Sequence, residues 1–167
     1  NPFIVNTEGT SIFFGTEFKT LELIAGWIYD SRNRALFADR GSRQQLYIGY
    51  SLPVSEVEFF TARYNYTKYI NIYGPFTFRI NAELAYGQAL GETTALPPYK
   101  QFYGGGPLNI RGFRESWMGP RDSFGNPYGG NVLVASQLEL IIPVPERFRN
   151  SARASLFFDA GNVFNTG

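Results

Sequence analysis

The sequence predicts an all-β fold, an antiparallel transmembrane β-barrel of which this chain holds about six strands and one long loop. Apolar residues recur at every second position over segments of about ten residues, the length of a tilted membrane strand. The opposite face of these segments carries charged side chains, although charged residues make up only 17% of the chain. Aromatic residues make up another 17%, which is typical of a barrel with aromatic girdles.

The alternating segments follow one another at regular intervals, and the clearest of them covers residues 76–86. One of its faces carries Phe76, Phe78, Ile80, Ala82, Leu84 and Tyr86, and the other carries Thr77, Arg79, Asn81, Glu83 and Ala85. The predicted strands are residues 21–30, 43–52, 60–67, 76–86, 132–142 and 153–160. A weaker pattern at 11–18 predicts part of another strand.

Short turns are predicted at residues 31–42, 70–75 and 143–147, and one unpatterned stretch covers about 88–130. Turns that follow alternate strands lie at one end of a sheet, so the long loop belongs at the other end. In outer-membrane barrels the short turns are periplasmic and the long loops are extracellular. About six strands cannot close such a barrel. We therefore expect residues 1–167 to form one partial barrel domain of a longer protein.

The predicted polar faces carry charged residues on every strand, namely Glu22, Arg43, Arg63, Arg79, Glu83, Glu139, Arg153 and Asp159. In a barrel these side chains line a polar lumen, whereas in a soluble sheet they form a solvated outer face. The second arrangement leaves open a soluble β-sandwich binding module whose aromatic residues fill its core.

Composition argues against several classes of function. The formal net charge is +1, which gives no strong field to attract nucleic acid, so no nucleic-acid partner is expected. The chain contains no cysteine and no histidine, which removes thiolate chemistry, the commonest general base and the commonest transition-metal ligand. Motifs for phosphate binding or for a nucleophilic serine are absent from the sequence. We expect neither an enzyme nor a requirement for a cofactor.

The long loop contains the sequence Ile-Arg-Gly-Phe at residues 110–113. A loop arginine such as Arg111 is usually solvent-exposed, but if the loop folds back into the lumen its guanidinium needs carboxylate partners. Two inward carboxylates, Glu139 and Asp159, lie on the next two predicted strands. A guanidinium can bind one of them bidentately and also reach the other.

The remaining residues of the motif complete a hypothetical latch that holds the loop. Gly112 would supply a tight turn and Phe113 an apolar plug beside it. Ile110 precedes Arg111 and belongs to the same latch.

Several stretches together resemble a known family. They are Phe-Tyr-Gly-Gly-Gly at 102–106, Ile-Arg-Gly-Phe at 110–113, Met-Gly-Pro-Arg at 118–121 and Phe-Phe-Asp-Ala-Gly-Asn-Val-Phe at 157–164. This pattern is similar to the BamA family, the β-barrel assembly factors of the Gram-negative outer membrane, whose sixth extracellular loop carries a Val/Ile-Arg-Gly-Phe/Tyr motif. The resemblance extends over roughly residues 20–167.

The resemblance implies a place in the bacterial outer membrane and a part in folding and inserting β-barrel proteins there. It implies that Arg111 points into the lumen and pairs with Glu139 and Asp159. It also implies three kinds of partner: outer-membrane lipid, unfolded outer-membrane proteins and accessory assembly lipoproteins. The POTRA domains of the family are not expected within residues 1–167. A TamA-like assembly factor and a two-partner secretion transporter share the motif and remain alternatives.

Overall fold

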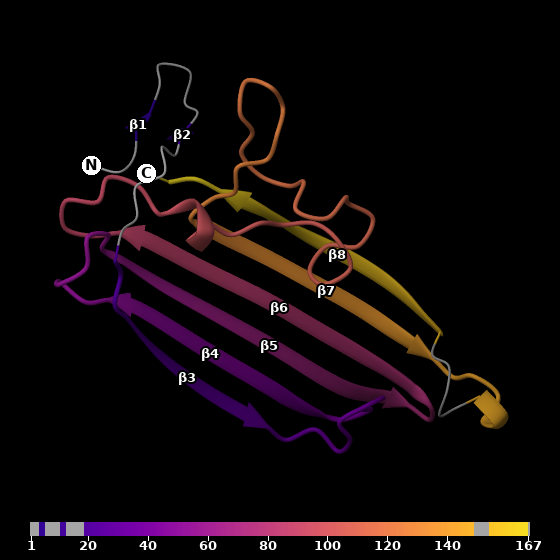
Figure 1. Cartoon of the computed structure of the whole chain (residues 1–167). Helices are drawn as coiled ribbons and strands as arrows, with labels where there is room; N and C mark the ends of the chain where they lie inside the picture. The colour runs from indigo at the N-terminus through magenta and orange to yellow at the C-terminus, as the bar shows by residue number, and fades with distance from the viewer. Residues whose placement is uncertain (1–3, 6–10, 13–18, 149–153, 167) are drawn as a thin grey trace.

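The structure is a computed structural model, and it describes residues 4–5, 11–12, 19–148 and 154–166. Most of these residues form one antiparallel sheet in which six strands pair in sequence order, with β3 at one edge and β8 at the other (Figure 1). The strands are β3 (Glu22–Asp30), β4 (Gly41–Ser51), β5 (Phe59–Tyr73), β6 (Phe76–Ala89), β7 (Val132–Ile142) and β8 (Ala154–Phe164). The predicted antiparallel all-β fold is confirmed, and within this chain the sheet stays open.

The remaining elements are short. Two two-residue strands, β1 (Ile4–Val5) and β2 (Ser11–Ile12), pair with each other. Two 3-10 turns, η1 (Pro98–Lys100) and η2 (Glu146–Phe148), lie in the connections after β6 and β7. No helix among the described residues is long and apolar enough to span a membrane. Of the weak strand predicted at 11–18, residues 11–12 form β2, and the rest lies outside the described residues.

Three predicted strands end too early: β6 continues from residue 86 to Ala89, and the other two ends have a physical reason. β5 continues to Tyr73, so the turn predicted at 70–75 shrinks to Gly74 and Pro75, with a register irregularity between Asn71 and Tyr73. β8 continues past Ala160 to Phe164, through Gly161. That glycine marks a close approach rather than a strand end, because a Cβ there would meet the Val134 carbonyl oxygen and Ala135 Cα of β7 and would lie 2.8 Å from Ile110 Cδ1 of the loop.

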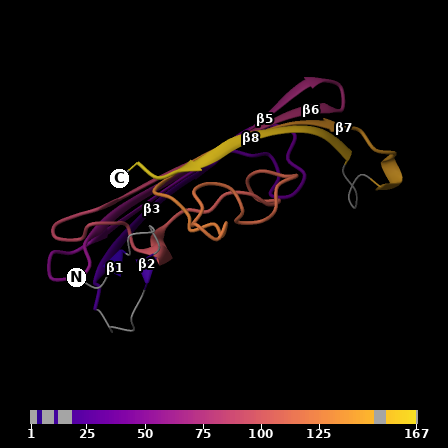
Figure 2. The same cartoon turned by 90° about the horizontal axis from the view of Figure 1, so that it is seen from above.

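The loop between β6 and β7 covers one face of the sheet, which we call the inner face (Figure 2). The principal buried cluster lies between that loop and the sheet, and it comprises Ala85, Phe102, Ile110, Leu133, Ala135 and Val163. The other face exposes large apolar side chains, among them Leu23, Trp27, Leu84, Leu156 and Phe158. A folded loop, and not a second large sheet, therefore covers the inner face, which argues against the β-sandwich alternative.

Candidate loop-anchoring site

Backbone hydrogen bonds fold the middle of the loop into a compact turn above β7 and β8. The Gly106 N–H donates to the Phe113 carbonyl over 3.0 Å, and the Ile110 N–H donates to the Gly106 carbonyl over 3.1 Å. The Ile110 side chain is only 1% exposed and packs in the buried cluster with Leu133 and Val163. This packing brings the next residue, Arg111, against β8.

Arg111 binds the carboxylate of Asp159 with two side-chain nitrogens and its backbone. Its Nε donates to Asp159 Oδ2 over 2.8 Å and its Nη2 donates to Oδ1 over 2.7 Å. The Arg111 backbone N–H also donates to Oδ2, over 2.8 Å. The Asp159 side chain is 2% exposed, so the pair lies largely out of water. Hydrogen bonding to Asp159 raises the pKa of Arg111 above its ordinary value, which keeps the guanidinium charged.

Glu139 provides a longer contact to the same guanidinium. Its Oε2 lies 3.6 Å from Arg111 Nη1, but only 2.7 Å from Nη1 of Arg79 on β6. The Ser155 hydroxyl on β8 donates to the other oxygen, Oε1, over 2.6 Å. Two guanidinium groups thus share one connected network with two carboxylates, and their formal charges balance.

The sequence reasoning did not connect three residues, Arg79, Ser155 and Phe157, with this network, although it placed Arg79 on the polar face. Arg79 stands directly opposite Glu139 across β6 and β7, and this register could not be read from either strand alone. Phe157 places its ring 4.0 Å from the Arg111 guanidinium carbon. Phe157 and Ser155 have the same strand parity as Asp159, so the period-two pattern was the signal that could have found both.

The residues around Arg111 differ in how well they fit the latch hypothesis. Gly112 has a φ of +87°, a conformation that glycine adopts without strain. Phe113 is 57% exposed within this segment of the barrel, and its role as an apolar plug stays a prediction. Among these residues, Ile110 provides the buried apolar contact with the sheet.

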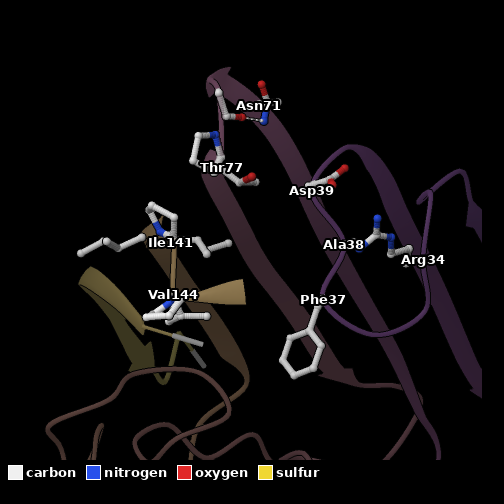
Figure 3. A pocket seen from close by; sticks show the side chains of 13 residues that line it. Arg34, Phe37, Ala38, Asp39, Asn71, Thr77, Ile141 and Val144 are labelled. Carbon is white, nitrogen blue, oxygen red and sulfur yellow. Dashed lines mark hydrogen bonds between the residues drawn. The ribbon is translucent and has the colours of Figure 1, made fainter. Parts of the chain in front are cut away.

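A separate cavity of about 400 Å³ lies at the turn end of the sheet (Figure 3). It is bordered by Phe37 and Asp39 from the β3–β4 turn, Thr77 from β6, and Ile141 and Val144 at the end of β7. None of the residues that contact Arg111 borders this cavity. In the parts of the chain that the structure describes, no cluster of His, Cys, Asp or Glu could hold a metal ion.

Residues 14–167 match the family model described as the Omp85 superfamily domain. The chain belongs to the Omp85 superfamily. The outer membrane protein assembly factor BamA of Neisseria meningitidis is 31% identical over 145 residues, which are 84% of this chain and 18% of that protein. The sorting and assembly machinery component 50 homolog of Homo sapiens is 40% identical over 70 residues, 39% of this chain and 15% of that protein.

A solved structure gives the same result for this Omp85 segment. The crystal structure of BamA from Haemophilus ducreyi lacking POTRA domains 1–3 superposes with a TM-score of 0.86 at 28% identity. The match covers 98% of this chain and 33% of that one, so the segment spans about a third of the solved barrel protein and a smaller share of the curated relatives. The predicted resemblance to BamA and the bacterial outer-membrane location are confirmed.

Proposed function

We propose that the chain is a wall-and-loop segment of an outer-membrane factor that folds and inserts β-barrel proteins. The similarity to BamA of Neisseria meningitidis, named as an outer membrane protein assembly factor, supports this proposal. The sorting and assembly machinery proteins of Homo sapiens and Saccharomyces cerevisiae are related in sequence as well. The observation that carries the proposal is the bidentate contact from the loop motif to β8, between Arg111 and Asp159, within a chain of this family.

In this proposal the segment catalyses no covalent reaction and binds no nucleic acid. Its substrates are unfolded outer-membrane proteins, its surroundings are outer-membrane lipid, and accessory lipoproteins assist the complete protein. A seam elsewhere in the barrel and a distorted bilayer lower the barrier to insertion. The six strands described above serve as the stable wall against which that seam opens.

Residues 110–113 with Glu139 and Asp159 act in this proposal as a latch that holds the loop to the inner face. Arg111 contributes the charged contacts, Gly112 the turn and Ile110 the buried side chain. Breaking a buried ion pair by removing one partner typically costs about 3–5 kcal/mol, because the remaining charge is left without compensation. That cost is large enough to release the loop while the hydrogen-bonded sheet persists.

The proposed function can be tested in cells that depend on the full-length protein. Depletion should reduce the amount of folded β-barrel protein in the outer membrane, and re-expression of the wild-type gene should restore it. Heat-modifiable electrophoresis of the barrel proteins measures the folded fraction. If depletion leaves that fraction unchanged but blocks secretion of one exported protein, the transporter alternative replaces this proposal.

A further inference from the structure

A second part of the loop lies on the inner face, far in sequence from the Arg-Gly motif. We call residues 96–102 the cross-strand arm. At its start, Leu96 is buried with Val57 and Phe59, where β5 begins. At its end, Phe102 enters the buried cluster with Ala85 of β6 and Leu133 of β7. Between these points the arm reaches toward β3, the opposite edge strand from β8.

Two of the three strands beneath the arm carry glycine where it crosses them. Gly49, Thr61 and Gly87 are paired across β4, β5 and β6, and therefore form one row on the inner face. A Cβ on Gly87 would lie 2.7 Å from Leu96 Cδ2, and one on Gly49 would lie 2.5 Å from Glu22 Oε1. Both glycines therefore leave room, one for the arm itself and one for the carboxylate that it contacts.

The arm ends its crossing in an ion pair. Lys100 Nζ donates to Glu22 Oε2 on β3 over 2.6 Å, and both side chains are mostly shielded from water. The same ammonium lies 5.2 Å from the centre of the Phe59 ring, within the range of a cation–π contact. Tyr99 meets that ring edge-on, with 6.4 Å between the ring centres. Short range and partial burial make this pair stronger than an ordinary surface ion pair.

We propose that the cross-strand arm is a second anchor of the loop, independent of Arg111, and that Lys100 is its positioning residue. The ion pairs of the two anchors involve different strands. Lys100 binds β3, whereas Arg111 binds β7 and β8. One loop thus connects the two edges of the six-stranded wall. Loss of either anchor frees its own part of the loop and leaves the other part attached.

Hydrogen exchange of the full-length protein in lipid vesicles tests this inference. The Lys100 N–H donates to the Pro97 carbonyl over 2.8 Å, so its exchange reports on the arm, and the Arg111 N–H reports on the motif. Lys100→Met should speed exchange in 96–102 by about tenfold, the effect of losing one charged hydrogen bond. Exchange in residues 108–113 should change less than about twofold.

Matched variants separate positioning from general damage. Lys100→Arg keeps the charge and should retain protection. The double variant Lys100→Glu with Glu22→Lys swaps the two charges of the pair and should restore most of the protection. Lys19→Met removes an exposed lysine near the same edge and should have no effect. If Lys100→Met prevents folding, Glu22→Gln removes the charge from the strand side of the pair and should give the same exchange pattern.

Two results would overturn the inference. Unchanged protection of 96–102 in Lys100→Met would show that the ion pair does not hold the arm. Equal loss of protection in 96–102 and 108–113, in both Lys100→Met and Arg111→Ala, would show that the loop opens as a single unit.

Discussion

Asp159 accepts three hydrogen bonds from one loop residue, two from the Arg111 guanidinium and one from its backbone. A lysine at this position could keep the charge but would lose the planar fork that binds both carboxylate oxygens. The nearby Phe157 ring covers the flat face of the same group. These contacts depend on guanidinium shape as well as on charge, which explains why arginine suits this position.

The burial of this ion pair sets the cost of breaking it. Asp159→Asn should lower the free energy of unfolding by about 3–5 kcal/mol, because Arg111 loses its charged partner out of water. Asp30→Asn is a matched control: Asp30 binds Arg32 over the same 2.7 Å but is 37% exposed, so its loss should cost much less. Denaturant titration of the full-length protein in vesicles measures both. Equal losses would contradict the importance of burial.

Backbone strain at Gly112 gives a second prediction. An added Cβ would meet nothing within 4 Å at Gly112 or at Gly125, and both residues have positive φ, +87° and +82°. Each substitution by alanine should therefore cost only about 1–2 kcal/mol of backbone strain. Gly112→Ala should also speed exchange of the Arg111 N–H, whereas Gly125→Ala should not. Faster Arg111 exchange in both variants would refute a local role for Gly112.

Sequence reasoning reached Arg111, Glu139 and Asp159 because strand parity identifies inward side chains and a buried guanidinium needs acidic partners. It could not rank the two carboxylates, since their distances depend on the loop path. It did not connect Arg79 with this network because pairing with Glu139 depends on the β6–β7 register. It could not predict how far Phe113 is buried, because parity does not apply within an irregular loop.

Among the elements, β5, β6 and β7 are joined by a row of polar side chains on the inner face. The Thr67 hydroxyl donates to Asn81 Oδ1 over 2.7 Å, and Asn81 Nδ2 donates to Gln137 Oε1 over 3.2 Å. The Gln137 amide also donates to the Leu108 carbonyl over 3.4 Å, which links the row to the loop. Side-chain hydrogen bonds therefore supplement the backbone ladder of the central strands.

Asn81 lies at the centre of this row and should be its position most sensitive to substitution. Asn81→Ala removes a donor and an acceptor together and leaves Thr67 and the buried Gln137 without these partners, so it should cost about 1–3 kcal/mol. Asn71→Ala is the control, because this exposed residue of the same hairpin donates only to the Gly74 carbonyl. Thermal unfolding of the two variants in vesicles compares them. A loss in Asn71→Ala as large as that in Asn81→Ala would contradict the role of the row.

Element positions followed from the period-two pattern, whereas three element ends did not. The predicted strand ended at Ala160, yet β8 continues through Gly161, where the missing Cβ leaves room for the β7 backbone and for Ile110. The predicted end of β5 came too early. The apolar residues Ile70 and Ile72 belong to the strand, which ends at Tyr73, just before Gly74. These two errors arise where a residue serves a tertiary contact or a pairing partner that the local sequence does not reveal.

At the scale of the whole molecule, the loop lies along the inner face and contacts both edge strands, β3 through Lys100 and β8 through Arg111. The outer face exposes apolar side chains, as a lipid-facing surface requires. A single segment thus contains both a sheet with an apolar outer face and a loop that is fixed across its inner face. In the proposed function, a loop attached in this way stiffens the wall, and we expect any opening of the complete barrel at other strands.

The most direct test of this account measures barrel assembly by the purified full-length protein in lipid vesicles, with wild-type protein compared with Arg111→Ala. Heat-modifiable electrophoresis of the protein itself first establishes that its own barrel is folded. The account predicts that folded Arg111→Ala protein assembles an unfolded client barrel at least tenfold more slowly, since about 1.4 kcal/mol of lost stabilisation in the active state gives that factor. The contradicting result would be a folded Arg111→Ala protein that assembles the client at the wild-type rate, although hydrogen exchange shows that its loop is released from β8.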